Sequence, residues 1–537
     1  MTALDRPAAG LQPRDALGQH ALAAIPRILT LQDRNPASPT FGCFDRNYWQ
    51  YRMIDFPSGM AQEFVWPLAL AWSLPLPRNP WHQAPAVRDW IEAGIRFAAR
   101  SAHPDGSCDD YYPWERATGA AAFSLLACIE AADIIGLDDA ETRGFLARRA
   151  GWLASHRESG RLANHEALVV LGLLRLSETT GEPRWRQAAG PRLQRLLSWQ
   201  SPEGWFAEYE GCDPGYLTLT ISLLARIAKM APGAGLDAAL ERAARFAAQF
   251  SHPDGTYGGE YGSRNTLNFF PHGFELTGRA IPEALAVNDR FLQALHEGRA
   301  PCHDDDHILG HHAWNFLLAW RDWVPQRPVP PPHPEGRHWF PQAGLLIDRR
   351  GGTELYAAPG KGCVFKLFRD GRLVWSDTQV SLRLAERTAV AHMMGGSTVE
   401  IQDDAVGASG EMCWAKAALM TPARMVVLRL VMMTLGRLSP NLVRRLLQRL
   451  LIVGRRPAPF HFSRRLSWRD GGWVVEDTIG GGPWSAVTAA GIGGHQTSIH
   501  VVMSRVWAAE QMQPWADLTP EAARLDDGAV LRLERRL

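Results

Sequence analysis

The stretch HPDGSCDDYYPWERATGAAAFSLLACIEAA, residues 103–132, holds three features in a fixed order. A turn with an acidic residue and a glycine comes first, a short loop of polar and aromatic residues follows, and an apolar run long enough for a helix ends it. The same order recurs in SPEGWFAEYEGCDPGYLTLTISLLARIAK, residues 201–229, and in HPDGTYGGEYGSRNTLNFFPHGFELTG, residues 252–278. Such self-similarity at a regular interval predicts a repeat architecture.

The spacing of the turn glycines gives the length of the repeat. About fifty residues accommodate two helices of three to four turns and two connections. A helical hairpin cannot bury its apolar stripe alone, so we expect six hairpins to stack into an (α/α)6 toroid over residues 1–324. The first and last copies are the weakest. The glycines, at intervals of 47, 54, 44, 51 and 55 residues, are Gly59, Gly106, Gly160, Gly204, Gly255 and Gly310.

The pattern changes after a proline-rich stretch at 325–336, which predicts a stiff linker. KGCVFKLFRDGRLVWSD (361–377) and FSRRLSWRDGGWVVEDTI (462–479) each place two short apolar runs around Asp-Gly, which is a hairpin signal. GLLIDRR, STVEIQDD and TSIHVVMSRVW are typical of further strands. We therefore expect an α+β multidomain chain, with an antiparallel β-sandwich over 337–537 that a helical insertion interrupts at about 423–456.

The composition is that of an ordinary globular protein, with 46% apolar and 21% charged residues. A chain of 537 residues with a formal net charge of +1 is expected to have two or three domains and no nucleic-acid partner. The 21 tryptophans could be core residues or stacking platforms for sugars. Seven scattered cysteines indicate reduced thiols, and neither a signal peptide nor a run of 18 apolar residues is visible. We therefore expect a cytoplasmic protein.

A ring of helical hairpins followed by a β-sandwich resembles the heparinase II/III family of polysaccharide lyases. The resemblance covers most of the chain, and it implies a carbon–oxygen lyase that needs no cofactor. Its substrate would be an acidic, uronate-containing polysaccharide or oligosaccharide in bacterial exopolysaccharide metabolism. The details that carry it are FDRNYWQYRMIDF (44–56), YYPWERATGAAAFSLLACIEA (111–131), the helix start NHEAL (164–168), EGWFAEYEGCDPGYLTLTISLL (203–224), DDDHILGHHAWNFLLAW (304–320) and SIHVVMSRVW (498–507).

The resemblance implies three catalytic residues. In β-elimination the C5 proton of a uronate becomes acidic enough to remove only when the carboxylate is neutralised, and the leaving oxygen must receive a proton. Asn164 and His165 match the residues that hold the carboxylate, and Tyr216 matches the residue that moves the proton. Asn164 could instead cap the helix that begins in RLANHEALVVLGLLRL, because Asn is a favoured N-cap.

Six further residues in the same loops are candidates for substrate binding. An arginine suits a carboxylated sugar through a bidentate contact, but Arg264 could equally pair with Glu260. Glu115 and Arg116 could form a structural ion pair. The candidates are Arg116, Trp205, Tyr209, Tyr261, Arg264 and Asn265.

The sequence departs from the family where the sandwich usually supplies a His-rich motif, HxHxD. Lys361-Gly362-Cys363 stands at the corresponding place. This departure keeps open a protein that binds a glycan without chemistry, serving polysaccharide synthesis or export. A hydrolase is a further alternative, with Asp109 or Asp110 and Glu208 or Glu260 as its acids.

The stretch CHDDDHILGHH could be a metal site, because His307 and His311 lie four residues apart on one helix face. Its aspartates also suit the start of a helix, where they cap it and complement its dipole. We expect no metal.

The insertion is strongly basic. From Met412 to Arg469 there are twelve Lys and Arg residues and no Asp or Glu. A basic amphipathic helix can lie in the headgroup region of an anionic membrane, which would place the protein peripherally on the inner membrane. The alternative is a helix that packs its leucines on the toroid or the sandwich. The apolar face expected after Ser439-Pro440 is formed by Leu442, Val443, Leu446, Leu447, Leu450 and Leu451.

Overall fold

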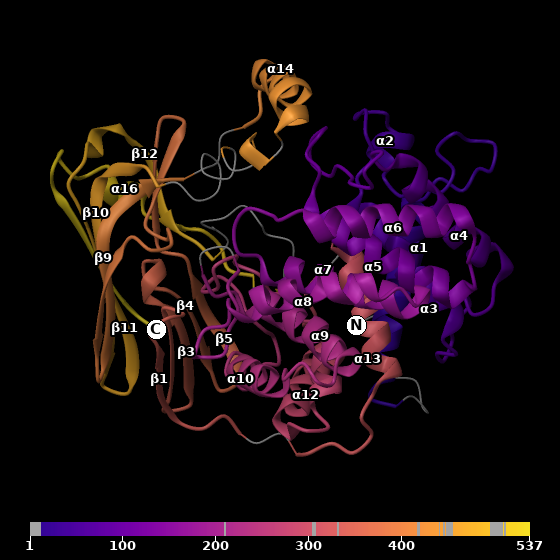
Figure 1. The fold of residues 1–537 in the computed structure, drawn as a ribbon. Helices are drawn as coiled ribbons and strands as arrows, with labels where there is room; N and C mark the ends of the chain where they lie inside the picture. The colour runs from indigo at the N-terminus through magenta and orange to yellow at the C-terminus, as the bar shows by residue number, and fades with distance from the viewer. Residues whose placement is uncertain are drawn as a thin grey trace.

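The computed structural model describes residues 12–208, 211–302, 308–329, 332–415, 419–439, 441–443, 446, 455–494, 508–509 and 512–537. In this part of the chain helices form the N-terminal portion and antiparallel strands form the C-terminal portion (Figure 1). The expected architecture, a helical toroid followed by a β-sandwich, is confirmed.

The toroid has an inner and an outer layer of helices. Each inner helix contacts the next inner helix along the chain, and the last contacts the first, so the ring closes. The inner helices are α3 (Val65–Ser73), α5 (Thr118–Ile135), α7 (Ala163–Thr180), α9 (Pro214–Met230), α11 (His272–Thr277) and α13 (Leu309–Arg321). The outer helices are α1 (Asp15–Leu31), α4 (Pro85–Ser101), α6 (Ala140–Ser155), α8 (Pro183–Leu197), α10 (Asp237–Ala248) and α12 (Pro282–His296). The short elements α2 (Arg46–Trp49) and η1 (Met60–Phe64) precede α3.

The two layers differ in composition because they differ in exposure. Inner helix α5 is covered on all sides, and nearly all its residues are buried. Outer helix α4 buries only one stripe, which includes Val87, Ile91 and Ile95. Among the described helices, α5 alone is long and apolar enough to cross a membrane, and 83% of it is buried inside the toroid. Its composition is therefore that of a core helix.

The repeating glycines have a structural cause. Gly106, Gly204 and Gly255 have φ of +89°, +111° and +78°, which disfavours other residues. Each also lies against the backbone of an outer helix, so a Cβ at Gly204 would be 2.4 Å from the Arg242 carbonyl oxygen. Gly42 has the same features, with φ of +94° and α4 as its neighbour.

The two weakest copies of the repeat were assigned to the wrong glycines. Gly59 has φ of −71° and is the N-cap of η1, so Gly42, with its positive φ, is the turn glycine of the first hairpin. Gly310 lies inside α13, where its lack of a side chain lets Glu63 and Phe64 approach the helix. Both glycines resemble the repeat in sequence only.

The sandwich consists of two antiparallel sheets. The first has the order β1-β2-β3-β4-β5, formed by β1 (Gly336–Phe340), β2 (Leu345–Arg350), β3 (Thr353–Ala358), β4 (Val364–Arg369) and β5 (Arg372–Asp377). The second has the order β13-β12-β6-β7-β9-β10-β11-β14, with β8 also paired to β9. Its strands are β6 (Val380–Leu384), β7 (Arg387–Val390), β8 (Ser397–Gln402), β9 (Ala405–Trp414), β10 (Pro457–Arg469), β11 (Gly472–Gly480), β12 (Val487–Ile492), β13 (Ala516–Asp517) and β14 (Val530–Arg536), and α16 (Thr519–Ala522) packs on β12.

The first sheet lies between the toroid and the second sheet (Figure 1). Successive side chains of a strand point to opposite faces, so β2 places Ile347 in the toroid core and Leu346 in the sandwich core. Both faces are covered, which explains why β2 and β4 are almost continuously buried. The largest fully buried side chains include four indoles, which are therefore core residues: Trp66, Trp314, Trp473 and Trp484.

Both predicted Asp-Gly hairpins are present. Asp370 and Gly371 have φ of +49° and +77° between β4 and β5, and Asp470 and Gly471 have +49° and +73° between β10 and β11. Two consecutive residues with positive φ are the signature of a tight hairpin turn whose twist matches the strands. GLLIDRR and STVEIQDD contain strands β2 and β8, whereas the whole of TSIHVVMSRVW lies outside the described residues.

The chain passes from α13, which ends at Arg321, to β1, which begins at Gly336. Arg327 in this connection pairs with Glu275 and Asp289 of the toroid. The connection is thus held against the toroid by buried or partly buried carboxylates.

The insertion between β9 and β10 contains α14 (Pro422–Val431), which continues into a wide helical turn, η3 (Met432–Gly436). Figure 1 shows α14 at the same end of the molecule as α2, and Arg429 of α14 pairs with Asp55 of the toroid. No residue of α14 is buried. Of the leucines expected to form an apolar face, Leu442 and Leu446 are exposed, and Leu447, Leu450 and Leu451 lie outside the described part of the chain.

Candidate active site

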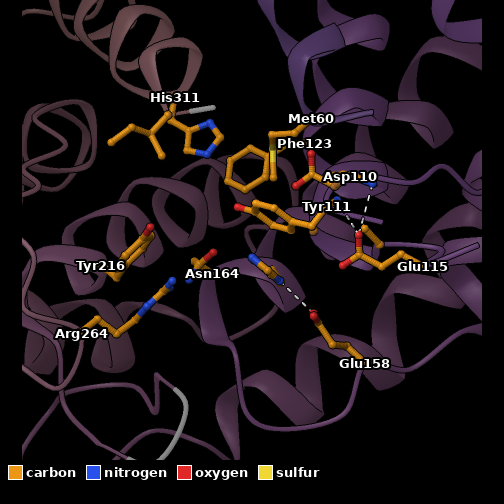
Figure 2. Close-up of a pocket in the computed structure, with 15 residues that line it drawn as sticks. Met60, Asp110, Tyr111, Glu115, Phe123, Glu158, Asn164, Tyr216, Arg264 and His311 are labelled. Atoms are coloured by element: carbon orange, nitrogen blue, oxygen red, sulfur yellow. Dashed lines mark hydrogen bonds and ion pairs between the residues drawn. The ribbon is translucent and has the colours of Figure 1, made fainter. Parts of the chain in front are cut away.

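A pocket opens at the ends of the inner helices α5, α7, α9 and α13, with a cavity volume of about 120 Å³. Asn164, His165 and Tyr216, the three residues expected to be catalytic, all line it. Figure 2 shows Tyr216 and Arg264 on one side of the pocket and Asp110 and Glu115 on the opposite side. The lining residues are Met60, Asp110, Tyr111, Glu115, Ala117, Gly119, Ala120, Phe123, Glu158, Asn164, His165, Tyr216, Arg264, Ile308 and His311.

Asn164 lies in the first turn of α7 but does not cap it. The helix begins at Ala163, and the residue before it, Leu162, is the N-cap. The Asn164 side chain is fully buried, and its Nδ2 donates to Glu208 Oε2 over 2.8 Å. Its Oδ1 accepts no hydrogen bond from any described residue. The helix-cap interpretation is therefore wrong, and the amide keeps one hydrogen and its oxygen for another partner.

Glu208 links Asn164 to the next two site residues. Arg264 Nη1 donates to Glu208 Oε1 over 2.7 Å, and the Arg264 guanidinium lies over the Tyr216 ring at 4.1 Å from its centroid. Burial raises the pKa of Glu208, although the charge of Arg264 opposes that rise. Asp213 sets the geometry, because its carboxylate accepts from the backbone N–H groups of Tyr216 and Arg264.

His165 faces the pocket as a neutral imidazole. Burial lowers its pKa to about 4. Its Nδ1 lies 2.8 Å from Glu158 Oε2, and an ionised carboxylate can only accept, so the proton is on Nδ1 and Nε2 keeps its lone pair. The ring packs on Gly119 of α5, where a Cβ would lie 2.9 Å from His165 Nε2. Gly119 is therefore needed for this position of the imidazole.

The opposite side of the pocket is acidic. Asp110 accepts from Ser58 Oγ at 2.6 Å, and Glu115 accepts from the backbone N–H groups of Asp110 and Tyr111. Together with Glu158, these carboxylates give this side of the pocket a negative character. Sequence reasoning took Glu115 as a partner of Arg116, but Arg116 pairs with Asp105.

His311 contributes a ring to the pocket that the sequence did not single out for this role. It stacks on Phe123 with ring centroids 3.7 Å apart, and its Nδ1 lies 2.5 Å from Glu63 Oε2. Glu63 also accepts from Trp314 Nε1. His307, the other histidine of the proposed pair, lies outside the described residues. In the described part of the chain no three His, Cys, Asp or Glu residues form a group suited to a metal.

Six residues were proposed for substrate binding, and among the five of them that the structure describes only Arg264 lines the pocket. Its carboxylate partner is Glu208 rather than Glu260, which pairs with Lys366. Tyr261 is a core residue that contacts His252 Nε2 through its hydroxyl, and Asn265 is fully buried. Trp205 donates to Glu203, and Arg116 binds Asp105 as described above. Tyr209 lies outside the described residues.

Lys361, which stands where the family would have its histidines, has a structural role here. Its Nζ donates to the backbone carbonyls of Glu260 and Gly262 over 2.7 and 2.8 Å. Burial lowers the pKa of Lys361 to about 8. The sandwich therefore supports the toroid loop that carries Arg264, and Lys361 does not line the pocket.

The fold is similar to that of solved polysaccharide lyases. Its toroid and sandwich match the xanthan lyase of Paenibacillus with a TM-score of 0.51 and 10% identity over 91% of this chain and 47% of that chain. The chain thus spans about half the length of that lyase and has the fold of the polysaccharide lyases, as the resemblance to heparinase II/III implied. Chondroitin AC lyase of Streptomyces coelicolor A3, in complex with chondroitin sulphate, is similar at a TM-score of 0.49 and 12% identity over 90% of this chain and 68% of that chain. Heparinase III is similar at 0.46 and 10% identity over 88% and 78%.

No protein-family model matches the chain, and no curated protein is similar to it in sequence. The similarity to solved structures therefore concerns the fold, and the chemistry of the pocket has to be argued from its own residues.

The sequence alone did not identify three carboxylates that contact side chains of the pocket. They are Glu63, Glu158 and Glu208. Glu208 was considered only as a hydrolase acid. Its position next to Asn164 depends on the contact of residue 162 with residue 208, in which two loops of neighbouring hairpins pair. The sequence did contain a signal for Glu208. Glu208, Glu158 and Glu115 each lie in the loop that precedes an inner helix of their own repeat.

Proposed function

We propose that this protein is a polysaccharide lyase that cleaves a uronate-containing glycan by β-elimination, in bacterial exopolysaccharide metabolism. The observation that carries the proposal is that Asn164, His165, Tyr216 and Arg264 line one pocket of a lyase fold. These residues supply an amide, a neutral imidazole, a phenol and a guanidinium, which together meet the needs of the reaction.

The carboxylate of the substrate would bind at Asn164 and Arg264. Both side chains donate to the Glu208 carboxylate, at 2.8 and 2.7 Å, so they are already arranged to bind a carboxylate. The substrate carboxylate must compete with Glu208 for these donors, and the burial that raises the pKa of Glu208 disfavours the charged form of this competitor. Neutralising the substrate carboxylate stabilises the charge that develops when the C5 proton leaves.

Tyr216 is suited to move the proton. Tyr216 acts as a phenolate that takes the C5 proton, while the electron pair of the C5–H bond forms the C4–C5 double bond and the C4–O bond breaks. The same phenol then returns a proton to the leaving glycosidic oxygen. The Arg264 guanidinium, 4.1 Å from the Tyr216 ring centroid, stabilises the phenolate that exists before the C5 proton is taken and forms again after the proton is returned. His165, neutral with a pKa of about 4, can accept a hydrogen bond from a sugar hydroxyl through Nε2.

The acidic side of the pocket narrows the substrate class. Asp110, Glu115 and Glu158 would repel a sulfate on the sugar next to the uronate. We therefore propose that the preferred glycan is an unsulfated uronate polymer. Unsulfated chondroitin and chondroitin sulphate form a matched pair for this point, because they differ in the sulfate alone.

The test is the ultraviolet absorbance of the C4–C5 double bond, followed with a panel of alginate, xanthan, hyaluronan, unsulfated chondroitin and chondroitin sulphate. The absorbance should rise with an unsulfated member, and Tyr216→Phe should lower the rate by about 10²–10⁴-fold. Tyr51→Phe, a change of an exposed tyrosine outside the pocket, is the matched control and should retain the rate. No absorbance with any uronate polymer, together with intact substrate on chromatography, would contradict elimination.

A second candidate is a glycan-binding protein without turnover. It is favoured by Lys361, which stands where active family members would supply histidines and whose Nζ donates to two toroid carbonyls. Binding that depends on Asn164 and Arg264 without any product would support it. If Asn164→Ala and Tyr216→Phe alter neither binding nor turnover, the pocket is not the glycan site under either candidate.

A further inference from the structure

The α14 segment, residues 419–439, exposes an unusual number of apolar side chains. Eighteen large hydrophobic side chains are exposed in the described residues, and nine of them belong to this segment. Exposed apolar surface concentrated in this way marks an interaction site. The nine are Leu419, Met420, Met425, Val426, Val427, Leu430, Met433, Leu435 and Leu438, with exposed fractions between 44% and 84%.

The segment has a single sign of charge. Residues 419–456 contain eight arginines and no acidic residue. Arg424 and Arg437 are exposed beside the apolar side chains. The partner must therefore offer apolar material and negative charge at the same place.

The segment is fixed to the toroid at one edge. Arg429 pairs with Asp55 over 2.5 Å, and Arg437 lies over the Trp114 ring at 5.0 Å. These toroid loops bring further exposed apolar groups, because Tyr51 and Met53 are 54% and 76% exposed. Figure 1 shows α14 and α2 at the same end of the molecule. The apolar and basic surface is thus placed at a defined end of the toroid.

We propose that the α14 segment docks on an anionic lipid membrane, with α14 lying along the headgroup region. Aliphatic side chains enter the boundary between headgroups and acyl chains, and arginines contact lipid phosphates. A soluble acidic polysaccharide would satisfy the arginines but leave the aliphatic side chains in water. A second copy of this chain would place one set of eight arginines against another.

Docking in this way brings the pocket close to the membrane. Trp114, which contacts Arg437, precedes Glu115 of the pocket, and Tyr111 both lines the pocket and is 60% exposed. The pocket would therefore meet a glycan chain that is held near the membrane surface. The membrane proposal does not depend on the elimination chemistry.

The test is co-sedimentation of the full chain with vesicles of phosphatidylglycerol and phosphatidylcholine, compared with vesicles of phosphatidylcholine alone. We expect binding to the anionic vesicles that weakens at high salt. The triple variant Val426→Ser, Val427→Ser, Leu430→Ser should lower the partition coefficient at least tenfold. Its matched control is Val329→Ser, which changes an 89% exposed side chain outside the segment.

A second pair of variants tests the charge. Replacing Arg424 and Arg437 with Gln should weaken binding about 25-fold, because each arginine near an anionic surface contributes about fivefold. Replacing Arg143 and Arg245, which are exposed on outer helices, should change it little. Circular dichroism and the unfolding midpoint check that each variant remains folded, as expected for changes at exposed positions.

Three results would overturn the proposal. Wild-type protein that stays in solution with anionic vesicles would exclude a lipid partner. Binding that survives the triple serine variant would place the membrane contact elsewhere. Self-association without lipid that the triple variant abolishes, seen by light scattering, would identify a second copy as the partner.

Discussion

The substitution Arg264→Met tests the electrostatic arrangement of the pocket. Glu208 is 2% exposed, and Arg264 Nη1 lies 2.7 Å from its Oε1. Removing one partner of a buried ion pair leaves an uncompensated charge and costs about 3–5 kcal/mol. We expect the free energy of unfolding to fall by about 3 kcal/mol at about pH 8, where the lost pairing is most costly.

The loss should depend on pH with a defined sign. Burial already raises the pKa of Glu208, and loss of the guanidinium raises it further. A carboxyl with a folded pKa above the unfolded value of about 4.3 binds a proton on folding, so it costs stability as the pH rises. This cost grows by about 1.4 kcal/mol per pH unit until the folded pKa is reached. The difference between variant and wild type should therefore be small at acid pH and large above the wild-type pKa of Glu208.

The assay is urea denaturation of wild type, Arg264→Met, Glu208→Gln and the double variant, at an acidic and a mildly alkaline pH. The double variant should recover most of the stability, because it no longer buries an unpaired charge. Arg96→Met, which breaks a surface cluster with Glu92 and Asp139, is the control and should cost about 0–1 kcal/mol. An equal loss at both pH values, or no recovery in the double variant, would refute the reasoning.

Three further predictions follow from particular contacts. Gly119→Ala should displace the His165 ring, because its Cβ would lie 2.6 Å from His165 Cε1. Turnover or glycan binding should then fall at least tenfold. The control Gly151→Ala has open space around its Cβ and should stabilise the fold by about 0.5–1 kcal/mol in denaturation. Arg464→Leu, which removes a fully buried cation from two buried aspartates of the sandwich, should cost about 3–5 kcal/mol in the same assay, and a cost below about 1 kcal/mol would contradict the pairing. The pKa of His165 is about 4 in the folded protein and about 6.5 in the unfolded chain, so the unfolded state binds the proton first as the pH falls. Stability should therefore decrease as the pH falls from about 6.5 to about 4. The free energy of unfolding, measured across this range, should decline in wild type and decline less in His165→Gln.

The repeat was visible in the sequence because its cause is local. Gly106, Gly204 and Gly255 each need a positive φ and a close approach to an outer helix, and both demands exclude other residues. Gly59 and Gly310 showed that a glycine in similar surroundings can serve another purpose. Asp370-Gly371 was equally predictable, since a tight hairpin turn depends on its own two residues.

The site was only partly predictable because it depends on contacts between hairpins. Asn164, His165 and Tyr216 could be found from their place in the repeat and from the resemblance to a family. Glu208 could not be assigned, because its contacts with Asn164 and Arg264 form only when two loops of neighbouring hairpins pair.

Tyr261 illustrates the opposite error. Tyr261 lies in the loop of the next hairpin, where a cleft residue was expected, but it packs in the core with Tyr356 of β3. A sequence pattern gives the loop in which a residue lies, and the neighbouring domain decides whether the residue is accessible.

The most direct test of the proposed chemistry is the mass of the products formed in water labelled with ¹⁸O. Elimination breaks the C4–O bond without adding water, so the new non-reducing end should carry a C4–C5 double bond, and the product pair should weigh one water less than the products of hydrolysis, with no label gained at the cut. Incorporation of ¹⁸O at the cut, in products that lack ultraviolet absorbance, would show hydrolysis by the acidic side of the pocket and would contradict the lyase.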